Sequence, residues 1–328
     1  MSTILLTGAN GFVGSHVLPA LVAAGHDVVA LVRSEAAADA VLAGLDPADH
    51  ARVAVRLGDV TKPDTLHAAL AGVDAVVHLV AIARDLNGGR DLASVNTEGT
   101  RNMVRAAEIA GVRRFVHLGA MGVADDPRLH YAGSKARAEA NVRGSALDWT
   151  ILKPSLMWGE GDGFFALIAG LVRFSPGIVP VPGDGKSRFQ PLWVGDLAHV
   201  VVLSLAGPET TGQSYDLGGP AYWTYREITR EVLGALGKQR LVIPMPVPLI
   251  SMVARASELV HLPFPVATDQ LRQLKLDTIG PLDGVERSFG FAPRPMNGHL
   301  GYLRHRGQHH GRRPAATATQ GPSTGLHD

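Results

Sequence analysis

The chain has 328 residues, 46% hydrophobic and 19% charged, and a formal net charge of +1. A nearly neutral chain has no bulk field that draws it to nucleic acid, and the lack of cysteine excludes disulfides, thiolate metal sites and cysteine nucleophiles. No apolar run of about 18 residues is free of charges and prolines, and the first residues do not resemble a secretory signal. We therefore expect a cytoplasmic protein without a spanning helix.

Short apolar segments alternate with helical stretches through the first half of the chain. Strands are expected at 3–7, 26–32, 53–60, 74–81, 113–120 and 149–155, and the first helix at 12–24. Apolar strands separated by helices are typical of a parallel sheet covered on both faces. The pattern predicts the α/β class, with a Rossmann-type doubly wound parallel sheet.

The second half is less regular and predicts a smaller C-terminal substrate lobe. Residues 1–158 are expected to form the nucleotide-binding domain, and 189–219 to return to it. Residues 159–188 and 220–303 are expected to form the lobe. Their pattern is irregular because prolines break the helical segments. Residues 304–328 lack apolar periodicity and predict a disordered tail. Three histidines lie there, but disorder argues against a native metal site, and we expect none: His305, His309 and His310.

The lobe is rich in apolar residues that suit either a core or a substrate site. These are segment 248–260 and Phe164, Phe165, Leu167, Leu171 and Phe174. Core packing is the simpler interpretation, while an apolar wall would suit an isoprenoid, quinone-like or lipid-like substrate. If segment 248–260 is an amphipathic helix, it is also a candidate for peripheral contact with a membrane.

Three glycines spaced three residues apart lie between the first strand and the first helix. Gly8 permits a tight turn, Gly11 lets the backbone approach a pyrophosphate, and Gly14 lets the helix pack closely on the strand. The N-terminus of the helix then presents free N–H groups to the phosphates. The loop therefore predicts a dinucleotide site, to which its neighbouring residues also belong: Asn10, Phe12 and Val13.

The residue that follows the second strand discriminates between the two nicotinamide cofactors. An acidic residue there binds the ribose 2′-hydroxyl of NAD, whereas arginine suits the 2′-phosphate of NADP. Arg33 holds this place and Glu35 lies further out, so the sequence favours NADP(H) over NAD(H). The alternative is that Arg33 is a solvated loop charge and Glu35 turns inward.

Further motifs make the chain resemble an extended or atypical short-chain dehydrogenase/reductase of the NAD-dependent epimerase/dehydratase type. They include GDVTKPDTL (58–66), VHLVAIA (77–83), VNTEGTRNMVRAA (95–107), YAGSKARAE (131–139), ILKPSLMWG (151–159) and PLWVGDLA (191–198). The subgroup that it resembles most is similar to an accessory subunit of respiratory complex I (NDUFA9-like). That resemblance implies an NAD(P)-binding protein with a small-molecule substrate, or one that contacts a respiratory complex.

The resemblance also implies roles for individual residues. Asp59 and Val60 would line the adenine pocket. Val80 and Ala81 would lie under the adenine ribose and the pyrophosphate. Each has a plainer alternative, because Asp59 also suits a turn and the other two suit the core of any such sheet.

Two more family positions lie nearer the nicotinamide. The resemblance implies that Asn96 is a helix-borne residue near the active site. It also implies that Pro154 and Ser155 flank the nicotinamide ring.

Tyr131 and Lys135 are the candidate catalytic pair. They lie four residues apart in a helical stretch, so their side chains share one face. An ammonium group nearby, together with the nicotinamide ring, lowers the pKa of a phenol from about 10. Tyr131 would exchange a proton with a substrate oxygen while hydride moves, and Lys135 would hold the ribose hydroxyls. The alternative is a core tyrosine beside a solvated lysine.

One partner of this pair is missing. The family places a Ser or Thr hydroxyl at the end of the fifth strand, where Gly119 and Ala120 stand here. His117 is close, but we expect it to point into the sheet. Losing such a donor lowers a rate by about 10² to 10³. Two functions stay open: an oxidoreductase or epimerase acting on an unknown carbonyl or alcohol, which we prefer, and a non-catalytic NADPH-binding redox sensor, assembly or interaction factor.

Overall fold

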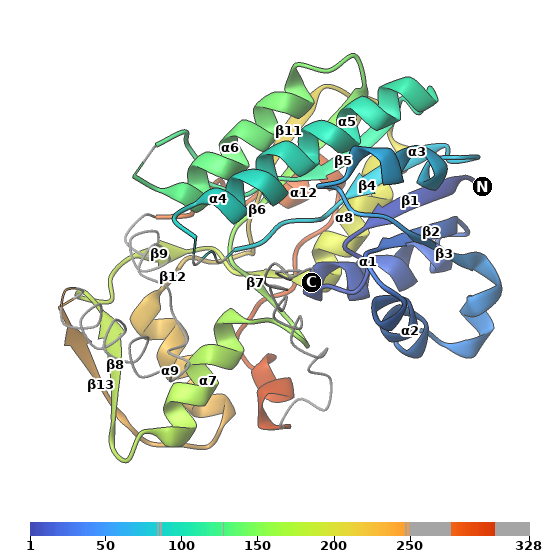
Figure 1. Cartoon of the computed structure of the whole chain (residues 1–328). Coiled ribbons are helices and arrows are strands. Elements are labelled where there is room, and N and C mark those ends of the chain that lie inside the picture. Colours follow the sequence, from blue (N-terminus) through green and yellow to red (C-terminus); the bar gives the residue numbers. More distant parts are fainter. Residues whose placement is uncertain (84, 86, 127, 247, 249–276, 306–328) are drawn as a thin grey trace, which may run out of the picture.

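A seven-stranded parallel sheet forms the centre of the molecule (Figure 1). The computed structural model describes residues 1–83, 85, 87–126, 128–246, 248 and 277–305. The strand order is β11-β6-β5-β4-β1-β2-β3. The strands are β1 Thr3–Thr7, β2 Asp27–Val32, β3 Val53–Leu57, β4 Ala75–His78, β5 Arg114–Leu118, β6 Asp148–Pro154 and β11 Gln213–Leu217. The order reverses between β1 and β4, which confirms the doubly wound Rossmann-type sheet.

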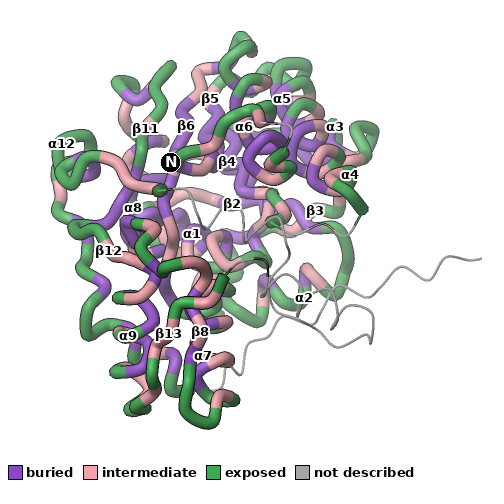
Figure 2. Tube along the Cα trace, turned by 90° about the vertical axis from the view of Figure 1, so that its left-hand side faces the viewer, coloured by how far each residue is buried: buried purple, intermediate pink, exposed green. Residues whose placement is uncertain are grey.

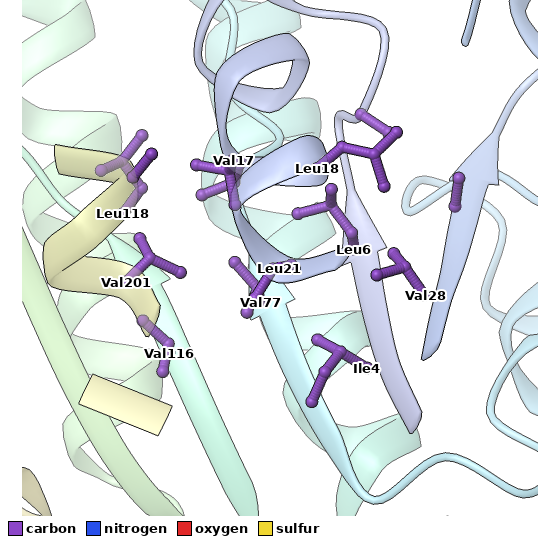
Figure 3. Close-up of a cluster of buried hydrophobic side chains, with 14 of the residues drawn as sticks. Ile4, Leu6, Val17, Leu18, Leu21, Val28, Val77, Val116, Leu118 and Val201 are labelled. Atoms are coloured by element: carbon purple, nitrogen blue, oxygen red, sulfur yellow. The ribbon is translucent and has the colours of Figure 1, made fainter. Parts of the chain in front are cut away.

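Helices cover both faces of the sheet. On one face, α1 Phe12–Ala23 and α8 Val194–Ala206 pack against the strands, and their valines and leucines meet those of β1, β2, β4 and β5 (Figure 3). On the other face lie α3 Leu66–Ala69, α5 Gly99–Ala110 and α6 His130–Arg143. Helix α2 Glu35–Ala43 follows β2. The buried strands between these layers explain why their sequences are apolar without alternation (Figure 2).

Three strands end earlier than the sequence predicts, and β5 is one of them, since it stops at Leu118 and not at residue 120. β3 stops at Leu57 and β4 at His78, so Val60, Val80 and Ala81 lie in loops and not in strands. The physical reason at β4 is a side chain: the hydroxyl of Thr7 accepts hydrogen bonds from Leu79 N at 3.1 Å and from Val80 N at 3.3 Å. These N–H groups are therefore satisfied without a neighbouring strand.

The half-buried guanidinium of Arg114 ties the second half of the chain to the sheet. It donates to Asp148 O at 2.6 Å, to the hydroxyls of Thr150 and Thr210 at 2.8 Å each, and to Ser204 O. The last two acceptors belong to α8 and to the turn before β11. One side chain thus joins β5, β6, α8 and that turn.

Replacing Arg114 should destabilise the fold. We expect Arg114→Met to lower the free energy of unfolding by about 2–4 kcal/mol, because several buried acceptors lose a charged donor. Arg113 is the matched control, since its exposed pair with Asp148 is of a kind worth less than about 1 kcal/mol. Urea unfolding of both methionine variants measures the difference, and equal losses would contradict this role for Arg114.

A smaller lobe lies beside the carboxyl ends of the strands (Figure 1). It contains α7 Phe164–Phe174, α9 Tyr225–Ala235, β8 Ile178–Pro182 and β13 Leu241–Met245, around a core with Trp158, Phe165 and Ile228. Short pairs β7 Met157–Trp158 with β10 Leu192–Trp193, and β9 Arg188–Phe189 with β12 Trp223–Thr224, connect it to the rest. Phe174 is 84% exposed, so its assignment to an apolar wall is wrong: it ends α7, beyond the last buried turn.

Parts of the sequence interpretation fall outside the described residues. Segment 248–260 lies there except for Pro248, and so does 306–328. In the ranges that are described, no helix is long and apolar enough to cross a membrane. The same ranges contain no cluster of His, Asp and Glu side chains arranged for a metal ion.

Candidate active site

The glycine loop lies between β1 and α1, at the carboxyl edge of the sheet. Gly8 has φ +74°, a backbone conformation that other residues rarely adopt. A Cβ on Gly14 would lie 2.1 Å from Gly8 O and 2.7 Å from the Cα of Ala9, so only glycine fits. A Cβ on Gly11 would meet Gly8 O alone, at 3.2 Å. Gly8 therefore forms the turn, Gly14 allows the close contact of the helix with the strand, and Gly11 leaves the backbone open to approach, as the spacing predicts.

Helix α1 begins without a side-chain cap. Gly11 is its N-cap, and the first bond of the helix runs from Ser15 N to Gly11 O at 2.9 Å. Uncapped N–H groups at the start of a twelve-residue helix are suited to a phosphate. The glycines leave room for the group and the helix supplies its donors, so these residues fit a dinucleotide pyrophosphate.

The remaining candidates on this side lie around the loop. Asn10 and Gly11 are exposed, and Val13 packs against the core under α1. The side chain of Phe12 lies near the start of the lobe. A Cβ on Gly161 or Gly159 would be 3.7–3.8 Å from its ring. The loop thus touches both parts of the molecule.

Arg33 is exposed directly after β2. The neighbouring Ser34 caps α2 by accepting a hydrogen bond from Ala37 N at 3.3 Å, and Glu35 is exposed in the first turn of that helix. The carboxylate of Glu35 is therefore carried on α2, while Arg33 remains at the end of the strand.

Asp59 and Val60 follow β3 on the same edge. The Asp59 carboxylate accepts bonds from Thr61 N at 2.9 Å and from the Thr61 hydroxyl at 2.8 Å, which makes it a turn residue. Val60 is buried, and a Cβ on Gly99 would lie 2.7 Å from its Cγ2. Across the sheet, Val80 is half-buried and Ala81 exposed in the loop after β4.

Lys135 is buried on α6, with only 3% of its surface exposed. Its ammonium group donates to Leu118 O at the end of β5. Tyr131 lies one helical turn earlier and is half-buried. The solvated lysine of the alternative interpretation is therefore excluded by its burial.

Burial shifts the pKa values of both side chains in the chain without cofactor. It lowers the pKa of Lys135 to about 8, against a smaller opposing effect of Glu139. It raises the pKa of Tyr131 to about 12, and the charge of Glu139 adds to that increase. The sequence predicts a lowered phenol pKa beside the ammonium and a bound nicotinamide ring. In the chain alone, burial and the charge of Glu139 act in the opposite direction.

Asn96 lies in a π-helical segment, Ala93–Glu98, and is almost fully buried. Its side-chain oxygen accepts from Ile82 N at 2.8 Å, and its amide donates to Ile82 O and to the hydroxyl of Ser134, each at 3.0 Å. The Ser134 hydroxyl donates in turn to Tyr131 O at 2.8 Å. Asn96 therefore positions the loop after β4 against the start of α6.

Glu139 fills the space where the family's hydroxyl is expected, and sequence reasoning missed it. A Cβ on Gly119 would lie 2.5 Å from Glu139 Oε1, and Ala120 N donates to that oxygen at 3.3 Å. Arg143 holds the other carboxylate oxygen at 2.9 Å. The spacing could have identified Glu139 as a neighbour of the pair, because it lies one turn beyond Lys135 on the same helix face.

Neither nearby candidate replaces the missing hydroxyl. His117 is buried, as expected, and stacks on His78 with 5.6 Å between ring centroids. The Ser155 hydroxyl follows Pro154, the last residue of β6, but donates to Thr278 O at 2.7 Å and accepts from Gln190 N at 3.2 Å. His117 is packed inside the sheet, and the Ser155 hydroxyl is already engaged in two hydrogen bonds.

The comparisons with known proteins agree with this geometry. A family model described as NAD(P)H-binding matches residues 8–164. A dTDP-glucose 4,6-dehydratase from Streptomyces venezuelae, crystallised with NAD, has a TM-score of 0.68 and 24% identity, covering 92% of this chain and 96% of that one. Residues 8–164 are therefore an NAD(P)H-binding domain. The fold is the one that this NAD-binding dehydratase has.

The relatives of the chain differ in what their names describe. A 3-beta-hydroxysteroid dehydrogenase of Mycolicibacterium neoaurum is 28% identical over 73% of this chain and 71% of its own. A 2-alkyl-3-oxoalkanoate reductase of Stenotrophomonas maltophilia is 29% identical over 73% and 77%. Subunit 9 of the NADH dehydrogenase alpha subcomplex of Arabidopsis thaliana is 24% identical over 83% and 69%. The chain is thus similar both to enzymes and to a subunit of a larger assembly.

Proposed function

We propose that the protein is an NADP(H)-dependent oxidoreductase that reduces an apolar carbonyl, with Tyr131 as proton donor and Lys135 beside it. The observation that carries the proposal is the burial of Lys135 against Leu118 O. A buried ammonium group is costly to a fold, so its place at the carboxyl edge of the sheet, one turn from a tyrosine, favours a chemical role.

In this proposal Tyr131 donates a proton and Lys135 stabilises the phenolate that is left. When bound, NADPH would supply the hydride that the carbonyl carbon receives. Because its pKa is about 12, Tyr131 carries its proton at neutral pH and can donate it to the carbonyl oxygen, which yields the alcohol. Lys135 is mostly protonated at pH 7 and stabilises the phenolate that remains, until solvent returns the proton.

The apolar substrate is supported by the relatives and by the lobe. The steroid and alkyl compounds in the relatives' names are largely hydrocarbon. The lobe beside the site is built on an aromatic cluster in which Phe164 contacts Phe165, Phe189 and Tyr225, with ring centroids 5.4–6.1 Å apart. Most of these rings belong to the buried core of the lobe, and Phe164 is half-buried at its edge, so the proposal of an apolar substrate is based mainly on the relatives.

The proposal is tested by the oxidation of NADPH with a panel of ketones. The panel holds 3-oxosteroids, 2-alkyl-3-oxo acids and quinones, with UDP-glucose as a polar control. We expect at least one apolar ketone to be reduced and the sugar nucleotide to be inert. NADPH binding without reduction of any member would overturn the oxidoreductase proposal and favour the second function below.

Arg33 should decide the choice between the two cofactors. We propose that it binds the 2′-phosphate, since it stands exposed at the end of β2 and Glu35 is held on α2. Arg33→Ala should weaken NADPH binding by about 10- to 100-fold, the value of a charged hydrogen bond, and leave NADH binding unchanged. Calorimetry with both nucleotides measures this. An equal loss for NADPH and NADH would contradict the assignment.

Lys135 should be dispensable for the fold although it is needed for turnover. Its pKa is lowered, so the penalty for burying the ammonium is fully present below pH 8. The penalty disappears as pH rises through 10.5, above which the lysine is neutral in both states. At pH 7, Lys135→Met should raise the free energy of unfolding by about 1–3 kcal/mol. This gain should shrink between pH 8 and 10.5 in urea unfolding. A loss of stability would show that Lys135 is a structural residue.

A second function is favoured by the site around Gly119. Glu139 occupies the space beside this glycine, and Ala120 has no hydroxyl. A protein that binds NADPH without turnover, as a redox sensor or an interaction factor, needs no such donor. The similarity to the Arabidopsis subunit is consistent with that function.

A further inference from the structure

We propose that the protein docks on anionic lipid bilayers through the tip of its smaller lobe. The lobe-tip patch consists of exposed Phe174, Ile178 and Leu241 with the cations Arg173, Lys238 and Arg240. It is formed where α7 ends and β8 and β13 begin, at the lower end of Figure 1. The proposal does not depend on the proposed reaction.

The apolar members of the patch are strongly exposed and close together. Phe174 is 84%, Leu241 64% and Ile178 48% exposed. Ile178 and Leu241 are register partners in the parallel pair of β8 and β13, so their side chains lie on the same face. Leu241 N donates to Gly177 O at 2.9 Å, which holds the two segments together. Scattered single apolar residues are normal on a surface, but three in one place indicate a contact.

The whole outward face of this two-stranded sheet is apolar. Val179 and Val181 point into the lobe core. Alternation therefore places the other residues of β8 on the outside, and their register partners in β13 beside them. The outward pairs are Ile178 with Leu241, Pro180 with Ile243, and Pro182 with Met245.

Positive charge lies at the end of this apolar surface where Ile178 and Leu241 pair. Arg240 donates to Ser175 O at 2.9 Å, which keeps it beside the end of α7, and Arg173 and Lys238 are exposed. Segments 170–182 and 233–245, which form the patch, contain no Asp or Glu. In a chain of net charge +1, three cations without an acid form a local excess. Apolar side chains beside basic ones match the acyl boundary and the headgroups of an anionic bilayer.

Vesicle binding of the full chain tests the proposal. The protein is sedimented with vesicles of equimolar phosphatidylglycerol and phosphatidylcholine, and with vesicles of phosphatidylcholine alone. We expect binding to the anionic vesicles, weakened by added salt, and little binding to the neutral ones. Phe174→Ser should weaken binding by about tenfold, and Lys238→Glu by a similar factor.

Matched controls show whether the patch itself is responsible. Ile109 is 68% exposed on α5, and Lys62 is exposed near β3. Ile109→Ser and Lys62→Glu should bind as the unaltered chain does, and circular dichroism should show all four variants folded. Equal binding by patch and control variants would overturn the proposal, and so would absence of binding to anionic vesicles. A concentration-dependent dimer that Phe174→Ser abolishes would also overturn it, since the patch would then be covered by a second copy.

Discussion

Replacing Tyr131 by phenylalanine should reduce kcat/KM by about 10² to 10⁴, because the variant lacks only the hydroxyl that supplies the proton. The affinity for NADPH should change less than about threefold, since the glycine loop and Lys135 remain in place. The measurement is NADPH oxidation with the ketone that the panel identifies, together with calorimetry of the nucleotide alone.

Tyr222→Phe is the matched control for this variant. The hydroxyl of Tyr222 donates to Gly280 O at 2.7 Å on the surface, so its loss removes a phenol without touching α6. We expect its kcat/KM to stay within about twofold of the unaltered protein. If Tyr131→Phe also retained its activity, the proton would come from another group and the role of α6 in the reaction would be wrong.

Adding one methyl group at Gly14 should have the second large effect. The new Cβ would lie 2.1 Å from Gly8 O and 2.7 Å from the Cα of Ala9, and both contacts are with backbone. Helix α1 must then move away from β1. We expect Gly14→Ala to lose about 3 kcal/mol of unfolding free energy and to bind NADPH at least 100-fold more weakly.

Gly11→Ala separates binding from stability at the same loop. Its Cβ would approach only Gly8 O, at 3.2 Å, so the fold should keep its stability within about 1 kcal/mol. The methyl group would nevertheless stand where the backbone must approach a phosphate, and NADPH binding should weaken by about tenfold or more. Wild-type affinity in this variant would contradict the placement of the pyrophosphate at Gly11.

The sequence predicts the central sheet and its covering helices well, because these elements depend on local signals. Apolar strands buried on both faces, helices between them and a glycine at each close approach are all visible in the order of residues, as at Gly8 and Gly14. The sequence predicts later ends for β3, β4 and β5 than the structure has. At β4 the reason is the hydroxyl of Thr7, which satisfies the backbone after that strand from another strand. Such a contact spans 72 residues of chain and has no local signature.

The candidate site is less predictable than the sheet and helices, because it too depends on contacts that have no local signature. Tyr131 and Lys135 can be found by their spacing, but the direction of the phenol's pKa shift depends on burial, which spacing does not report. That Glu139 fills the space beside Gly119 depends on how closely α6 approaches the end of β5. The exposure of Phe174 likewise depends on where α7 leaves the lobe core, and not on its helical periodicity.

The central claim is that the glycine loop and α6 together form a working NADP(H) site. Its most direct test is calorimetric titration of nucleotide-stripped protein with NADPH. We predict saturable binding of one NADPH per chain, with Kd in about the micromolar range and a weaker Kd for NADH. If neither nucleotide binds at millimolar concentration, the claim is contradicted, and the loop keeps the shape of a cofactor site without its function.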